Sequence, residues 1–147
     1  MAETACTFCD IIRGQAPASI VYEDEQVLAF MDIRPVNPGH VLVVPRSHAG
    51  CLAEMETATG AHLFQVGMKL AEAVRRSGVR CEGVNLFLAD GEAAGQEVFH
   101  VHLHVLPRFA GDGFGLRFGP DYLRLPQRSA LDEVAANIRQ ALETDRP

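Results

Sequence analysis

Residues 100–104 read His-Val-His-Leu-His, and this run constrains the fold of the chain more than any other feature. Polar and apolar residues alternate with a period of two, which is the period of a β-strand and not of a helix. A strand over residues 100–106 would place three imidazoles on one face, about 6–7 Å apart along the strand. Because neither a plain core strand nor a polar loop needs such a row, the run also predicts where the functional site lies.

The apolar pattern predicts four further strands, over residues 20–22, 27–31, 41–44 and 84–88. The run 41–44 is continuously apolar between Gly39 and Pro45, which is typical of a buried strand. Short turns between several strands favour an α+β fold, with about five antiparallel strands and the helices gathered to one side.

Helical spacing of apolar residues predicts one long helix over residues 58–77, ended by Gly78, with its buried positions at Leu63, Val66, Leu70 and Val74. Residues 7–13 predict a short helical turn. Ser129 is expected to cap a final helix. The remaining stretches predict loops over residues 32–39, 90–95 and 111–119.

Length and charge limit the possible classes of protein. The 147 residues fit a single domain over 1–147. The net charge of −6 argues against a nucleic acid polymer as partner, since that needs a basic surface. No apolar run could cross a bilayer and the first twenty residues lack a signal-peptide pattern, so a cytoplasmic protein without a membrane partner is expected.

From the residues alone, each of two motifs has more than one possible interpretation. Cys6 and Cys9 form a Cys-x-x-Cys spacing, which is half of a zinc site, a redox pair or chance. The three histidines could be a hydrogen-bonded strand face, a metal centre with a further ligand, or a site of nucleophilic catalysis.

Two segments together resemble the histidine triad (HIT) superfamily. The first reads Gly-Gln-Glu-Val-Phe over residues 95–99, followed by the triple histidine and Pro-Arg at 107–108. The second covers residues 30–48 and contains Pro-Gly-His, an apolar strand and Pro-Arg-Ser-His. The resemblance extends from Cys6 to Arg108 and implies a HIT-like α+β fold. It therefore divides the expected domain into a core at 6–108 and a C-terminal loop and helix at 109–147.

The resemblance implies a nucleotidyl hydrolase or transferase that acts on the α-phosphate of a nucleoside phosphoramidate or a dinucleoside polyphosphate. His102 matches the nucleophile, which forms a nucleotidyl-imidazole intermediate. His104 matches the residue that donates to the phosphate, and His40 matches the one that orients the triad. The one remaining histidine, His62, is expected to be ordinary surface.

The resemblance also implies a binding site for the nucleotide. Asp32 matches the acidic residue that accepts the ribose hydroxyls, although it could equally initiate a turn. The base slot would be formed by Phe8, Ile11, Phe30 and Ile33, any of which could instead be core. The phosphate or leaving group would meet the stretch of Gln96, Glu97 and Val98. Ala89 stands where better-known branches have an amide side chain.

The cysteines gain a meaning from the same resemblance, since Cys6, Cys9, His48 and His100 match a structural zinc site. The family implies a homodimer and a small nucleotide substrate based on adenosine or guanosine. Two other functions remain open at this level. One is a nucleotide-binding regulatory module with vestigial hydrolysis, and the other is a zinc-dependent hydrolase that uses the triad as metal ligands.

Overall fold

The computed structural model describes residues 5–144. The chain forms two compact units, one that ends at Phe114 and one that begins at Gly115. They are described separately below. The expected single domain over residues 1–147 stays a prediction.

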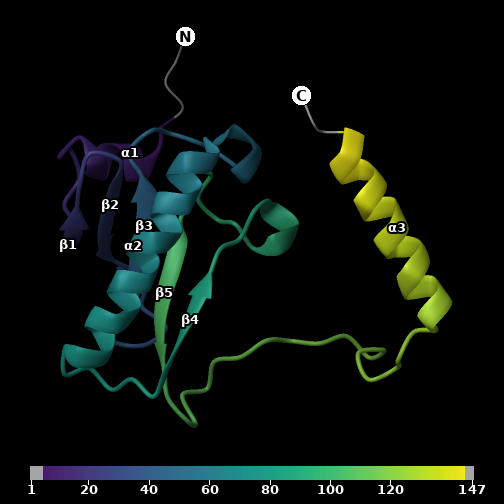
Figure 1. Cartoon of the computed structure of the whole chain (residues 1–147). Coiled ribbons are helices and arrows are strands. Elements are labelled where there is room, and N and C mark those ends of the chain that lie inside the picture. Colours follow the sequence, from purple (N-terminus) through teal and green to yellow (C-terminus); the bar gives the residue numbers. More distant parts are fainter. Residues whose placement is uncertain (1–4, 145–147) are drawn as a thin grey trace. The chain divides into compact units, whose positions relative to one another are not determined.

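The first unit contains a five-stranded sheet in the order β1-β2-β3-β5-β4, in which every neighbouring pair is antiparallel (Figure 1). The strands are β1 (Ile20–Glu23), β2 (Val27–Met31), β3 (Val41–Pro45), β4 (Gly83–Phe87) and β5 (Leu103–Arg108). The predicted α+β fold with a five-stranded antiparallel sheet is therefore confirmed.

The alternation of side chains gives the sheet two buried faces. One face packs against the long helix α2 (Thr57–Arg76), which lies across β3 and β5, and shares a core with its buried residues Leu63, Val66 and Leu70. The other face packs against Phe8 of the short helix α1 (Thr7–Ile12), through Leu28, Phe30, Leu42 and Val44. His104 lies on this second face, because it pairs with Leu42.

Strand β5 begins three residues later than predicted, at Leu103 instead of His100. The regular pairing of β5 with β3 ends at Leu103 and Val43. Pro45, at the end of β3, has no N–H to continue the ladder. The preceding residues bond to the chain after β3 in other ways: Val101 donates its N–H to the Ala49 carbonyl, at 2.8 Å.

His62 is more than ordinary surface. Its Nε2 lies 2.7 Å from Asp24 Oδ2, which joins α2 to the turn between β1 and β2. Asp24 also accepts hydrogen bonds from the Tyr22 hydroxyl and from the backbone N–H groups of Gln26 and Val27. Burial raises the pKa of Asp24, but hydrogen bonds, foremost from His62, outweigh burial and hold it well below its usual value.

The second unit contains helix α3 (Arg128–Thr144), and none of its described residues is buried. The expected cap at Ser129 is wrong, since the helix begins one residue earlier, at Arg128. Over the described part of the chain, no helix combines the length and apolar character that a membrane span requires.

Candidate active site and metal centre

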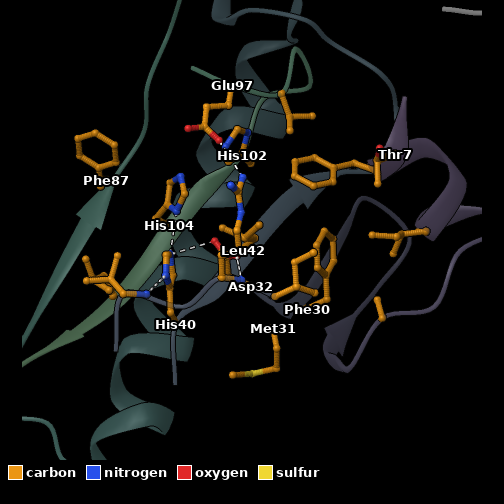
Figure 2. Close-up of a pocket in the computed structure, with 18 of the residues that line it drawn as sticks. Thr7, Phe30, Met31, Asp32, His40, Leu42, Phe87, Glu97, His102 and His104 are labelled. Atoms are coloured by element: carbon orange, nitrogen blue, oxygen red, sulfur yellow. Dashed lines mark hydrogen bonds and ion pairs between the residues drawn. The ribbon is translucent and has the colours of Figure 1, made fainter. Parts of the chain in front are cut away.

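A cavity of about 700 Å³ opens on the α1 face of the sheet (Figure 2). All the predicted catalytic residues and all the predicted nucleotide-binding residues except Gln96 line it: His40, His102, His104, Asp32, Phe8, Ile11, Phe30, Ile33, Glu97 and Val98. In Figure 2, Phe30 and Phe87 lie on opposite sides of His102 and His104. The cavity therefore has apolar walls around a group of imidazoles.

The tautomer of His102 follows from one hydrogen bond. Its Nδ1 lies 2.7 Å from the carbonyl oxygen of His100. Because a carbonyl can only accept, Nδ1 carries the proton and Nε2 of the neutral ring keeps a free lone pair. The buried ring also packs edge-on against Phe8, at 5.2 Å between centroids, which fixes its orientation.

His40 and His104 form a chain of hydrogen bonds with a defined direction. The Val36 N–H donates to His40 Nδ1 at 3.1 Å, so the proton of neutral His40 is on Nε2. That nitrogen lies 2.8 Å from His104 Nδ1 and donates to it. The proton of neutral His104 is consequently on Nε2.

Both rings favour the neutral form. Burial, together with the neighbouring rings of His102 and His40, lowers the pKa of His104 to about 4. Burial also lowers the pKa of His40, although Asp32 opposes this change. At neutral pH the pair therefore offers a neutral N–H donor from a histidine that lines the cavity.

Asp32 has contacts that fit both of its interpretations. Its Oδ1 accepts the backbone N–H of Arg34 at 2.8 Å, as a turn-initiating Asp does. Its Oδ2 lies 3.7 Å from His40 Nε2, and the side chain is 19% exposed on the cavity wall. The carboxylate therefore holds the loop and also remains available to a ligand.

Gln96 supports the site without lining the cavity. Its buried amide donates to the carbonyls of Gly50 and Val98, at 2.8 and 3.0 Å, and accepts the Gly91 N–H at 2.7 Å. These bonds hold the loop before the histidines in one conformation. Ala89 is buried and adds no polar group.

A second cluster brings together Cys6, Cys9, His48 and His100, whose ligand atoms all lie within 4.8 Å of one another. His100 Nδ1 is 3.4 Å from Cys6 Sγ, 3.5 Å from Cys9 Sγ and 3.3 Å from His48 Nδ1. Tetrahedral zinc ligands at the usual bond lengths lie about 3.3–3.6 Å apart. The spacing is therefore compatible with a closed zinc site.

The chemistry of the donors agrees with this geometry. His100 Nε2 donates to the Pro45 carbonyl at 2.8 Å, which leaves the lone pair of Nδ1 directed to the cluster. Burial and the neighbouring Cys6 thiol raise the pKa of Cys9 to about 11. A thiolate at Cys9 therefore needs a cation beside it, as a zinc ion would provide.

Several cavity residues were missed by the sequence analysis, among them Arg34 and Phe114. Arg34 could have been noticed as a basic residue two positions after Asp32. Phe114 gave no signal, because it reaches the cavity through a turn held by the Arg108–Asp112 ion pair, with Nε–Oδ2 at 2.6 Å. That pairing with Arg108 holds the pKa of Asp112 well below its usual value.

Comparisons with known proteins find relatives that share this fold. A crystal structure of a protein from Streptococcus mutans matches with a TM-score of 0.87 at 39% identity, covering 96% of this chain and 87% of that chain. A zinc-bound histidine triad family protein from Mycobacterium smegmatis matches with a TM-score of 0.73 at 43% identity, covering 90% and 97%.

A curated relative carries an activity in its name. This adenylylsulfatase of Arabidopsis thaliana is 35% identical over 103 residues, which are 70% of this chain and 52% of that protein. The model of the HIT domain matches residues 13–111. With that match over residues 13–111, this chain belongs to the HIT family, as the sequence analysis predicts.

Proposed function

We propose that this chain hydrolyses nucleotides at the α-phosphate through a covalent nucleotidyl intermediate on His102. The observation that carries the proposal is the 2.7 Å hydrogen bond from His102 Nδ1 to the His100 carbonyl. This bond leaves Nε2 unprotonated on a histidine of the cavity wall. A neutral imidazole with a free nitrogen is a competent nucleophile near neutral pH.

The reaction would proceed in two steps. His102 Nε2 attacks the α-phosphorus, a P–N bond forms, and the leaving group departs with the electron pair of its bond to phosphorus. Nδ1–H continues to donate to the His100 carbonyl, whose oxygen stabilises the positive charge on the imidazole ring. Water then attacks the phosphorus and passes a proton to solvent, the P–N bond breaks, and its electron pair returns to Nε2.

His104 would bind the phosphate oxygens through its Nε2–H. The relay from Val36 through His40 orients this donor before the substrate arrives. Because the pKa of His104 is about 4, the donor stays neutral over the physiological range. The donor therefore does not depend on a titration near neutral pH.

The nucleoside would lie at the α1 end of the cavity. The aromatic rings of Phe8 and Phe30 meet there edge-on, at 5.4 Å between centroids, and offer an apolar wall for a base. Asp32 has a carboxylate oxygen available for ribose hydroxyls. The adenylylsulfatase relative supports adenosine as the nucleoside.

We further propose that Cys6, Cys9, His48 and His100 hold a structural zinc ion. The support is the tetrahedral spacing of the donors and the zinc-bound relative. Four protein ligands leave no open position for water, which argues for a structural ion and against a zinc-dependent hydrolase. When bound, the ion would tie α1 to the residues just before His102.

A homodimer remains part of the proposal. Strand β4 forms one edge of the sheet, and Phe87 on it is 43% exposed. An open strand edge with an exposed aromatic side chain can pair with a second copy. Light scattering on the purified chain should give the mass of two copies, and the mass of one copy would contradict this.

A turnover screen tests the proposed reaction. It compares adenosine and guanosine phosphoramidates, dinucleoside polyphosphates and adenosine 5′-phosphosulfate, and should find hydrolysis at the α-phosphate in at least one class. His102→Ala should lower kcat by about 10³-fold or more, with nucleotide binding retained. If the chain binds nucleotides but hydrolyses none of them, the regulatory module is the correct function.

A further inference from the structure

One exposed ion pair joins two loops of the cavity. Arg34 lies in the loop after β2, and Glu97 lies in the loop before the triple histidine. Arg34 Nη2 is 3.0 Å from Glu97 Oε2, with the two side chains 82% and 77% exposed. Both residues line the cavity that contains His102 and His104.

The charged residues around the cavity are mostly acidic. Among the described lining residues, Arg34 is the one arginine or lysine, whereas Asp32 and Glu97 are both carboxylates. A nucleotide whose leaving group is phosphate or sulfate brings further negative charge. Glu97 would repel that charge, and Arg34 is the side chain that can compensate for it.

An anionic ligand can replace Glu97 as the partner of Arg34. Exposed ion pairs contribute little stability, because solvent screens both charges. Arg34 gives one donor to Glu97, and its guanidinium makes no other hydrogen bond within the described part of the chain. A phosphate or sulfate can accept two parallel N–H groups from arginine, so it is a stronger partner than this carboxylate contact.

The backbone around Arg34 is hydrogen-bonded to residues of the site. Its N–H is bonded to Asp32 Oδ1, and two residues later the Val36 N–H holds His40. The loop that carries the guanidinium is therefore the loop that orients the His40–His104 pair.

We propose that Arg34 determines specificity by binding the anionic leaving group of the substrate, and that Glu97 holds Arg34 in the free protein. The inference rests on the proposed hydrolase function and adds the class of leaving group. The chain prefers nucleotides that release phosphate or sulfate to those that release a neutral amine.

The test compares two substrates that differ only in the leaving group, adenosine 5′-phosphosulfate and adenosine 5′-phosphoramidate. The measured quantity is kcat/KM for the phosphosulfate divided by kcat/KM for the phosphoramidate. We expect Arg34→Gln to lower this ratio by about tenfold, or about 1.4 kcal/mol. Glu97→Gln should raise the same ratio severalfold, because it frees Arg34 and removes the repulsion from Glu97. The ratio for the double variant should fall well below that for Glu97→Gln, because Arg34 is then absent.

A matched control uses a second Arg–Glu pair away from the cavity. Arg46 Nη2 lies 2.9 Å from Glu23 Oε2, and neither residue lines the cavity. Arg46→Gln should leave the ratio unchanged. If Arg34→Gln leaves the ratio unchanged, or changes both kcat/KM values equally, the inference is wrong. Failure of the proposed function gives a different result, since the unsubstituted chain then hydrolyses none of the nucleotides in the turnover screen.

Discussion

At the scale of single residues, the three triad histidines differ in what fixes each ring. His100 donates through Nε2 to a backbone carbonyl, and His102 donates through Nδ1 to another. His104 accepts through Nδ1 from His40. One alternating sequence thus produces a nitrogen directed to the cysteines, an unprotonated nitrogen and an N–H donor.

The low pKa of His104 predicts a pH dependence of stability. Its pKa is about 4 in the folded chain, against about 6.5 in an unfolded chain. Between these values the unfolded state binds a proton that the folded state does not bind. The free energy of unfolding should therefore fall as pH decreases from about 6.5 to about 4, and this effect is absent above about 6.5.

Urea unfolding at several pH values within that window measures this slope. His104→Gln removes the titrating group and should give a shallower slope than the unsubstituted chain. Equal slopes for the two proteins would show that burial of His104 does not control acid stability.

At the scale of elements, α2 lies close to the sheet at Gly67. A Cβ at this position would lie 2.6 Å from Leu103 Cδ2, and Leu103 is buried in the core. Gly67→Ala should therefore lower the free energy of unfolding by about 1–2 kcal/mol, because overpacking outweighs the better helix propensity of alanine.

Gly60 in the same helix is the control for this prediction. A Cβ there would meet only Met55 Cε at 3.2 Å, the end of a flexible and partly buried side chain. Gly60→Ala should be neutral or stabilising by up to about 1 kcal/mol. Thermal unfolding measures the stability of both variants. Equal changes in stability would mean that Leu103 moves aside without a loss of stability, and would contradict the prediction.

The elements also show what the sequence could predict. The long helix and the four other strands follow from apolar periodicity, so their bounds differ from the structure by only a residue or two. The start of β5 differs more, because alternation continues through His100 and His102 although regular pairing has stopped. Periodicity reports which side chains face the core, not which backbone groups have partners.

The candidate site was predictable to a similar degree. His40, His102 and His104 line the cavity, and they could be predicted because each belongs to a local sequence motif, the Pro-Gly-His block or the triple histidine. Arg34 and Glu97 are 63 positions apart and meet only through the fold. Single-sequence patterns carry no information on such a pairing.

At the scale of the whole molecule, the cysteine–histidine cluster connects segments that are far apart in sequence. It joins α1, the chain after β3 and the residues before β5. If zinc is bound there, Cys6→Ser or Cys9→Ser should lose it and lower Tm by about 10 °C, roughly 3 kcal/mol for a chain of this size.

Metal analysis and thermal unfolding measure both effects. Cys51→Ser is the matched control, since Cys51 lies outside the cluster, and it should keep both zinc and Tm. Zinc that persists in both cluster variants would contradict the proposed structural site.

The central claim is that His102 becomes covalently nucleotidylated. Its direct test mixes the chain with an adenosine substrate that it hydrolyses and quenches the reaction rapidly. Intact-mass analysis and peptide mapping then show whether an adduct has formed and on which residue. We predict a mass increase of one adenylyl group on His102, its loss in His102→Ala, and its retention in the control His62→Gln. An adduct on another residue, or turnover in His102→Ala at a rate close to that of the unsubstituted chain, would contradict the mechanism.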